Sequence, residues 1–218
     1  MQDRVEPAHR IGRRPSTTRG ELSDLGIELF ATKGFDETSI DDIAEAAGIA
    51  RRTFFRYFPS KNAVPWGDFD AQLAALRSHL AGLPDDMELA EALRSALVQF
   101  NTFPPEETSV HRQRMSLILG TPALQSYSMV MYHGWRAVIA EFVAVTTGSK
   151  PTDHFPRTVG WIVLGVAISA YEQWLTDDRS SLADLLTAGI EPLRTGLASS
   201  GAPQTQPGAD AVRQKASE

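Results

Sequence analysis

The sequence predicts an all-α protein, with an N-terminal three-helix head and a C-terminal helical bundle, about nine helices in all. Apolar residues recur at the i, i+3, i+4, i+7 spacing of a helix in most parts of the 218-residue chain. No segment alternates apolar and polar residues as a half-buried strand does. Capping residues or prolines stand before several of the apolar runs and glycines after others, which is the order expected of helix starts and stops.

The first predicted helix ends at residues 33–35. Its apolar stripe consists of Leu22, Leu25, Gly26, Leu29 and Phe30. We expect Gly34 to take the left-handed conformation that ends a helix, and Phe35 to fold back onto Phe30.

Two short helices joined by a tight turn follow. Ser39 is a natural N-cap of the first, and Asp42 is placed to complete a capping box. The apolar face of this helix is Ile40, Ile43, Ala44 and Ala47. Gly48 supplies the positive φ of the turn. In the next helix Phe54 and Phe58 point inward, and the outer side carries Arg51, Arg52, Thr53, Arg56 and Tyr57. This pattern predicts a helix-turn-helix DNA reader.

Several short motifs of this segment occur together: Thr38-Ser39-Ile40, Ile43-Ala44, Ala47-Gly48-Ile49, Thr53-Phe54-Phe55-Arg56-Tyr57-Phe58 and Lys61. In this combination the chain resembles the DNA-binding region of the TetR family of bacterial transcriptional regulators, over about residues 16–61. Two positions depart from that pattern. Ala50 replaces a Ser or Thr cap, and Phe55 replaces a Tyr that commonly contacts a phosphate.

A narrower resemblance concerns residues 51–70. They include the unusual run Val64-Pro65-Trp66-Gly67-Asp68-Phe69-Asp70. This segment is similar to TetR-type regulators associated with mycofactocin gene clusters.

The predicted partner of the head, residues 16–61, is a double-stranded DNA operator. We expect Arg51 and Arg52 to contact base edges or adjacent phosphates, because arginine is the commonest reader of guanine. Thr53, Tyr57 and Lys61 are expected to contact phosphates. The full predicted set is Arg13, Arg14, Ser39, Arg51, Arg52, Thr53, Arg56, Tyr57 and Lys61.

Charge is distributed unevenly along the chain. Residues 1–61 contain ten Lys/Arg and ten Asp/Glu, so the net charge of −6 comes from the remainder. An acidic body would orient the basic end toward DNA. Residues 1–15 are predicted to be a flexible basic arm that follows the DNA backbone or enters the minor groove, the alternative being a solvated tail.

Residues 62–198 are predicted to form a ligand-binding and dimerisation domain, and residues 199–218 a disordered tail. The helices are expected at about 61–83, 86–103, 109–119, 122–147, 153–175 and 182–197. Ser60 should cap the first of these. Pro65 removes a hydrogen bond to residue 61, so we expect a kink or an opened turn there.

Large side chains are frequent in this second part and could line a small-molecule cavity between helices. The candidate lining residues are Phe100, Phe103, Met115, Tyr127, Met131, Trp135, Phe142, Trp161, Tyr171 and Trp174. Ordinary core packing is the alternative for each of them. Polar residues that could orient a ligand are His133, Arg136 and Gln173. The resemblance implies a ligand pocket in this half of the chain. The aromatic and methionine-rich lining, together with Pro65, predicts an apolar effector, with a fatty-acyl or acyl-coenzyme A molecule as one candidate and a simple lipid as the alternative. The few cations available for coenzyme A phosphates are Arg112, Arg114, Arg136 and Arg157.

A homodimer is predicted because a palindromic operator requires a two-fold symmetric reader. Small residues of the eighth helix allow close approach of a partner helix: Gly160, Gly165, Ala167, Ser169 and Ala170. The ninth helix would supply a second stripe: Leu182, Leu185, Leu186, Ile190 and Leu193.

Several other classes are disfavoured. The chain has no cysteine, and its five histidines lack the spacing of zinc-enzyme motifs. No P-loop, GxSxG or strand-following GxGxxG is found, so we predict no enzymatic activity, no cofactor and no metal. No signal peptide is apparent, and residues 159–170 are too few to span a bilayer, which favours the cytoplasm and no membrane. The remaining alternative is an all-helical small-molecule-binding protein without DNA activity.

Overall fold

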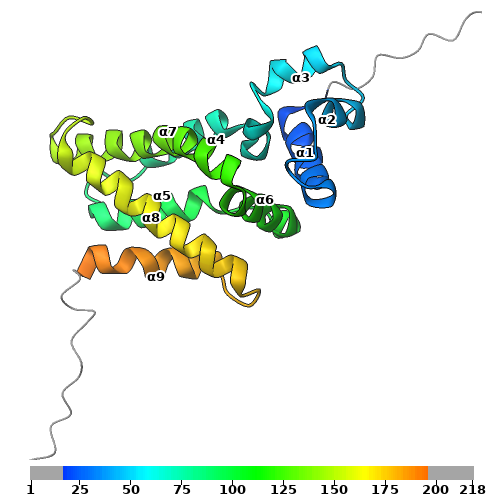
Figure 1. Ribbon diagram of the computed structural model, residues 1–218. Coiled ribbons are helices and arrows are strands. Elements are labelled where there is room, and N and C mark those ends of the chain that lie inside the picture. The colour runs from blue at the N-terminus through cyan, green and yellow to red at the C-terminus, as the bar shows by residue number, and fades with distance from the viewer. Residues whose placement is uncertain (1–16, 196–218) are drawn as a thin grey trace, which may run out of the picture. The chain divides into compact units, whose positions relative to one another are not determined.

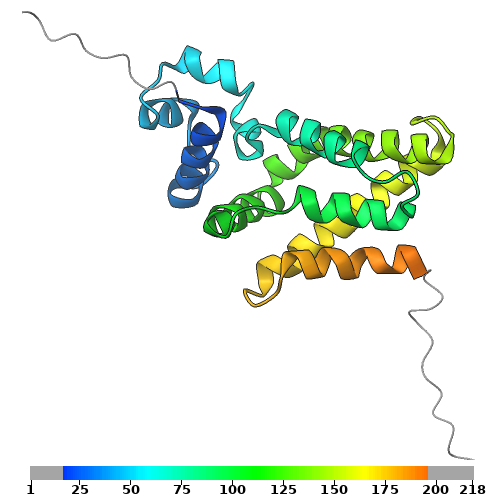
Figure 2. The same cartoon turned by 180° about the vertical axis from the view of Figure 1, so that it is seen from behind.

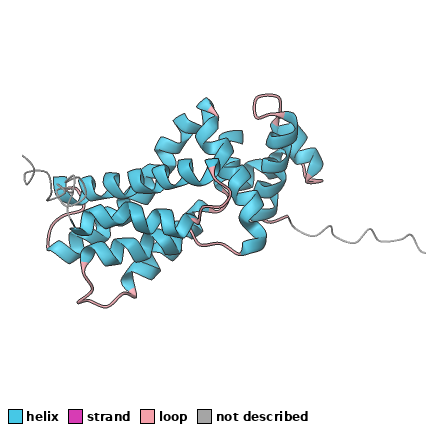
Figure 3. Ribbon diagram, turned by 90° about the horizontal axis from the view of Figure 1, so that it is seen from below, coloured by secondary structure: helices cyan, strands magenta, loops and turns pink. Residues whose placement is uncertain are grey.

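The computed structural model describes residues 17–195, and every regular element in that range is helical (Figures 1 and 3). The predicted arm, with Arg13 and Arg14, and the predicted tail lie outside the described residues. The elements are α1 (Arg19–Lys33), α2 (Ile40–Ala46), α3 (Arg51–Tyr57), the 3-10 helix η1 (Lys61–Trp66), α4 (Phe69–Ala81), α5 (Leu89–Phe100), the 3-10 helix η2 (Pro105–Glu107), α6 (Thr108–Gly120), α7 (Pro122–Thr147), α8 (His154–Thr176) and α9 (Leu182–Thr195). The all-α prediction is confirmed.

The chain folds as two compact units. Within the described range, the first unit comprises residues 17–74 and 103–134, and the second comprises residues 75–102 and 135–195. Helices α4 and α7 therefore contribute residues to both units. None of the helices in residues 17–195 combines the length and the hydropathy needed to cross a bilayer.

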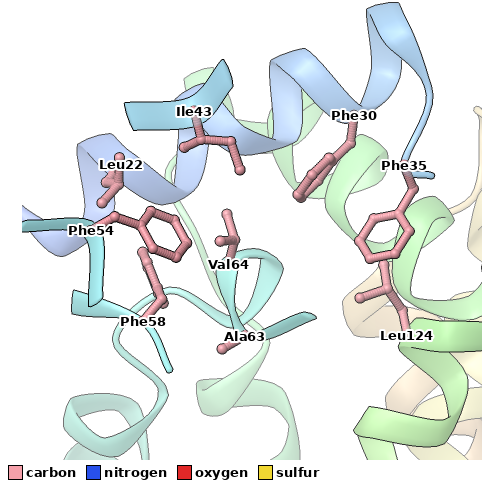
Figure 4. Packing of buried hydrophobic residues seen from close by; sticks show 9 residues of the cluster. All are labelled: Leu22, Phe30, Phe35, Ile43, Phe54, Phe58, Ala63, Val64 and Leu124. Atoms are coloured by element: carbon pink, nitrogen blue, oxygen red, sulfur yellow. The ribbon is translucent and has the colours of Figure 1, made fainter. Parts of the chain in front are cut away.

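The core of the first unit joins the predicted head to later parts of the chain. Figure 4 shows its nine buried side chains, which come from α1, α2, α3, η1, α7, the turn after α1 and the residue that follows α3. The members are Leu22, Phe30, Phe35, Ile43, Phe54, Phe58, Ala63, Val64 and Leu124. Because Ala63 and Val64 belong to this core, the packing of the head continues beyond residue 61.

The end of α1 differs in detail from the expectation. Gly34 has φ 98° and ψ 148°, so it is not in the left-handed helical region, although its positive φ still suits glycine. The ring of Phe35 packs on Phe30 with 4.9 Å between centroids, as predicted.

The single helix predicted over residues 61–83 is wrong. The chain instead forms η1, breaks at Gly67, and restarts as α4 at Phe69. Pro65 has no N–H for an α-helical bond, and Gly67 adopts φ 55°, which ends the 3-10 turn. Ser60 makes no side-chain cap bond here. The predicted opening near Pro65 is therefore real, but the break itself lies at Gly67.

The second unit is built around α5, α8 and α9, which pack against one another (Figure 2). Helix α9 buries Leu182, Leu186 and Ile190. A Cβ added to Gly189 would lie 2.7 Å from Cγ1 of Val166, so α8 and α9 approach closely at this glycine.

Candidate nucleic-acid interface

The turn between α2 and α3 is fixed by local hydrogen bonds. The Ser39 hydroxyl accepts from the backbone N–H of Asp42 at 3.1 Å, and the Asp42 carboxylate accepts from the backbone N–H of Ser39 at 2.7 Å. Hydrogen bonds from Lys33 and from Ser39 hold the pKa of Asp42 well below its usual range. Gly48 has φ 63°, and Ile49 N–H donates to the Ala44 carbonyl at 2.9 Å. The capping box and the glycine turn are confirmed.

Helix α3 presents opposite faces to the core and to solvent. Phe54 and Phe58 are fully buried, as predicted. Arg51, Arg52 and Arg56 are exposed. Thr53 and Tyr57 are half-buried. A short helix supported by two buried phenylalanines and carrying three exposed guanidinium groups can enter a major groove with its cations outward.

Arg51 is held in place by two neighbours. Its Nη1 donates to Asp41 on α2 at 2.6 Å, and its guanidinium lies over the ring of Phe55, 5.7 Å from the centroid. Exposed ion pairs contribute only about 0–1 kcal/mol, so a DNA phosphate or guanine can replace Asp41 as the partner. Phe55 replaces a Tyr that commonly contacts a phosphate, so it has no hydroxyl for that contact. Its exposed ring instead packs against the guanidinium of Arg51.

Tyr57 connects α3 to the start of α1. Its hydroxyl donates to the carbonyl of Thr17, directly before the N-cap Thr18. The hydroxyl oxygen can still accept a hydrogen bond, but its proton is used within the head. The phosphate contact of Tyr57 stays a prediction.

Lys61 has a structural role that its sequence position did not indicate. Its ammonium donates to the carbonyls of Phe35 at 2.7 Å and Thr38 at 2.9 Å, and lies 4.3 Å from the centroid of the Phe35 ring. These groups belong to the segment after α1. Ser39 is also occupied, because its hydroxyl belongs to the capping box. Phosphate contacts by Lys61 and Ser39 therefore stay predictions that compete with internal bonds.

A second set of contacts, which sequence reasoning missed, attaches η1 to α1 and α6. Buried Ser23 donates to the Val64 carbonyl at 2.7 Å. Arg114 on α6 donates to the Pro65 carbonyl at 3.0 Å and to Asp24 at 2.8 Å. A Cβ on Gly26 would lie only 2.4 Å from Cγ1 of Val64. A serine and a glycine on the buried side of α1 were the available signals for this close contact.

Comparison with known proteins agrees with this architecture. Residues 22–64 match the model of the tetR family of bacterial regulatory proteins, and residues 87–198 match the MftR C-terminal domain. The chain belongs to the TetR family.

Relatives within this family cover nearly the whole chain. The mycofactocin biosynthesis transcriptional regulator MftR of Mycobacterium tuberculosis is 56% identical over 86% of this chain and 95% of its own. The transcriptional regulator TcmR of Streptomyces glaucescens is 28% identical over 85% of this chain and 86% of its own. Both family resemblances seen in the sequence are thereby confirmed. This TetR-family protein is a DNA-binding transcriptional regulator, and the alternative without DNA activity is set aside.

The fold is shared with solved TetR-family structures. FadR of Thermus thermophilus, a TetR-family repressor solved in complex with lauroyl-CoA, aligns with a TM-score of 0.56. It is 23% identical, and the alignment covers 88% of this chain and 100% of that one. At this identity the likeness concerns the fold.

The ten predicted pocket residues divide between the two units of this TetR-family chain. Phe103, Met115, Tyr127 and Met131 lie in the first unit and are half-buried. The second unit holds the others, and it brings together two aromatic pairs, Phe100 with Trp135 and Tyr171 with Trp174, each with 6.0 Å between centroids.

Two of the aromatic residues in the second unit contact a polar side chain of the same unit. The Tyr171 hydroxyl donates to Oδ1 of Asn101 at 2.8 Å, which links α8 to the end of α5. Trp161 is 46% exposed, and the guanidinium of Arg136 lies 3.4 Å from its ring centroid. Of the polar residues expected to orient a ligand, His133 and Gln173 are exposed. A pocket lined by all ten residues stays a prediction.

The small residues of α8 do not share one environment. Gly160 is buried, and a Cβ there would lie 3.1 Å from the Arg136 carbonyl oxygen. Ala167 and Ala170 are buried as well, whereas Gly165 and Ser169 are exposed. The expectation that Gly160, Ala167 and Ala170 face a partner helix is therefore wrong, because these three pack inside the second unit, and it stays a prediction for Gly165 and Ser169. Exposed apolar side chains on the same helix are Phe155, Trp161 and Ile162.

Residues 17–195 contain no cluster of three or more His, Asp or Glu side chains that could hold a metal ion.

Proposed function

We propose that this regulator is a homodimeric repressor that acts on a palindromic operator in the cytoplasm and is released by an apolar, acyl-bearing effector. The observation that carries the DNA-reading part is α3, with Arg51, Arg52 and Arg56 exposed on a helix fixed by Phe54 and Phe58. Arginines at this position supply both groove contacts and neutralisation of phosphates.

The dimer part is supported by the surface of α8 and α9. Phe155, Trp161, Ile162 and Leu193 each expose more than a third of their surface. Gly165 lies on α8 with nothing within 4 Å of an added Cβ. Large apolar side chains exposed on two helices that pack together favour an association surface. Two recognition helices held by such a dimer would reach successive major grooves about one DNA turn apart.

The effector part is supported by chemistry and by likeness. Both units contain half-buried or buried aromatic and methionine side chains suited to an acyl chain. FadR of Thermus thermophilus was solved with lauroyl-CoA. Arg114 is already engaged by Asp24 and Pro65, and Arg136 by the ring of Trp161, so Arg157 is the better candidate for coenzyme A phosphates. A ligand shifts the equilibrium only if it binds the released state more tightly than the DNA-bound state.

The test is operator binding by the full chain, measured on DNA from upstream of its own gene with and without lauroyl-CoA. We expect sequence-specific binding that lauroyl-CoA weakens. The variant Trp135→Asp should lose the response, because a charge at a buried apolar position disfavours an apolar ligand. The variant His133→Gln, at an exposed position, serves as the control.

The dimer is tested separately by sedimentation. Gly165→Glu should fold normally, because the position has open space, but should sediment as a monomer and bind the operator weakly. A wild-type protein that is a stable monomer at micromolar concentration would refute this part of the proposal. Specific operator binding that lauroyl-CoA and related acyl compounds leave unchanged would refute the effector part alone.

A further inference from the structure

Trp66 carries a buried hydrogen-bond donor that has no acceptor among the described residues. Its side chain is 7% exposed, and its indole nitrogen is fully covered. Buried N–H groups are nearly always paired in folded proteins, because an unpaired one loses its bond to water without replacement. The unpaired donor therefore indicates an acceptor that is not among residues 17–195.

The orientation of this donor is fixed by its neighbours. The indole packs edge-on against Phe69, with 5.1 Å between centroids and 83° between planes. It packs in the same manner against Tyr132, with 5.4 Å and 81°. An aromatic ring held on two sides cannot rotate to find another partner, so the N–H points in one defined direction.

Polar groups close to Trp66 along the chain are already used. The carbonyl of Pro65 accepts from Arg114, and the carbonyl of Val64 accepts from Ser23. A bound water needs two to four polar partners, and the two backbone carbonyls directly before Trp66 already accept hydrogen bonds. An acyl group fits better, because it combines one acceptor oxygen with an apolar chain.

We propose that the indole N–H of Trp66 binds the carbonyl or carboxylate oxygen of the effector. This inference rests on the proposed release by an acyl-bearing effector and assigns the polar contact that orients it. In the same unit, Met115, Tyr127 and Met131 are half-buried apolar side chains suited to the acyl chain.

Trp66 lies in the chain next to residues of the DNA-binding head, so a ligand bound to its indole can influence the head. Val64, two residues earlier, belongs to the core of the head, and Gly67, the next residue, has φ 55° and ends η1. A ligand that bonds to Trp66 therefore acts on the segment that Ser23 and Arg114 attach to α1 and α6. Residues of this segment pack directly with Phe54 and Phe58 (Figure 4).

The test compares three probes of equal chain length: lauroyl-CoA, laurate and the thioether dodecyl-CoA, which lacks the carbonyl. Release of the full-length protein from its operator is measured for the wild type and for Trp66→Phe, which keeps an aromatic ring and removes the donor. Trp135→Phe is the matched comparison: it removes the other buried indole N–H that lacks an acceptor among the described residues, and it keeps an aromatic ring at this candidate pocket position. Operator affinity without any probe is recorded for each protein.

We expect lauroyl-CoA or laurate to release the wild type at a concentration about tenfold lower than the thioether, the factor that corresponds to one hydrogen bond. Response to laurate would identify a free carboxylate as the acceptor, and response to lauroyl-CoA alone a thioester carbonyl. Trp66→Phe should treat all three probes alike, and Trp135→Phe should keep the preference.

A direct readout avoids dependence on the folding of Trp66→Phe. The chain has four tryptophans, so an indole ¹⁵N spectrum of the wild type has four signals. Phe variants of Trp135, Trp161 and Trp174 assign the Trp66 signal by elimination. It should move downfield with the acyl probes and not with the thioether.

Three results would overturn the assignment of Trp66. The first is that thioether and acyl probes release the wild type at equal concentrations. The second is that Trp66→Phe still responds better to the acyl probes than to the thioether, and the third is that Trp135→Phe loses this preference instead. Each of them leaves effector release intact. If no acyl probe binds the wild type while operator binding persists, the proposed effector class is wrong, and the hydrogen bond proposed for Trp66 is wrong with it.

Discussion

Arg114 on α6 donates through Nη2 to the carboxylate of Asp24 on α1 at 2.8 Å. The same guanidinium donates through Nη1 to the carbonyl of Pro65, so one side chain joins three segments of the first unit. The carboxylate of Asp24 is more than half exposed, whereas Pro65 is buried. The backbone contact, and not the ion pair, should therefore dominate the energetics.

Arg114→Met is expected to lower the free energy of unfolding by about 1–3 kcal/mol, because the Pro65 carbonyl loses its donor. Asp24→Asn should cost less than about 1 kcal/mol, since it weakens only an exposed ion pair. Urea denaturation at neutral pH measures both. Equal losses in the two variants would show that the ion pair matters as much as the carbonyl contact.

Gly26→Ala tests the close packing of α1 on η1. An added Cβ would meet Cγ1 of Val64 at 2.4 Å, so we expect a loss of about 1–3 kcal/mol from overpacking. Gly20→Ala on the same helix is the control. Its nearest neighbour lies at 4.0 Å, and alanine there should stabilise by up to about 1 kcal/mol. Thermal unfolding that ranks the two variants in the opposite order would contradict the close contact.

Two variants distinguish a residue that contacts DNA from one that stabilises the head: Arg52→Ala and Lys61→Met. Arg52 is exposed on α3, so its replacement should weaken specific DNA binding by about 1–3 kcal/mol and leave thermal unfolding unchanged. Lys61→Met should instead lower stability by about 1–2 kcal/mol, because the carbonyls of Phe35 and Thr38 lose a charged donor.

The salt dependence of operator binding decides what Lys61 does. If the Lys61 ammonium binds a DNA phosphate, Lys61→Met should reduce the slope of log affinity against log salt by about 0.9. If that reduction occurs at unchanged stability, the structural role given to Lys61 is wrong. An unchanged slope with lower stability would support it.

His111 should make stability depend on pH. Burial, with a smaller contribution from the charge of Arg114, lowers the pKa of His111 from 6.5 to about 4. The unfolded chain therefore takes up a proton first as the pH falls. Stability is full above about pH 6.5 and decreases toward pH 4, by up to about 3 kcal/mol in total. His111→Phe should remove this part of the pH dependence, and His133→Gln should not, as urea denaturation at pH 4.5 and 7 would measure.

Local signals along the chain were enough to predict the helix-turn-helix and the family. The capping box pairs Ser39 with Asp42, three residues apart, and the inward face of the next helix pairs Phe54 with Phe58, four residues apart. The structure has both pairs, and the positive φ of Gly48, as expected. Caps, turns and helical faces depend on neighbours three or four residues away, so they can be read directly from the amino-acid order.

The packing of the helices, in contrast, determines the hydrogen-bond partners of Lys61 and Arg114 and the burial of Trp66. It also determines which small residues of α8 are exposed. Lys61 bonds to residues more than 20 positions earlier, and Arg114 bonds to residues 49 and 90 positions away. No spacing rule connects positions so far apart, because the partner of a long side chain depends on how helices pack. The exposure of Gly165 and the burial of Ala170 differ for the same reason: one face of α8 is covered by the rest of its unit and the other is not.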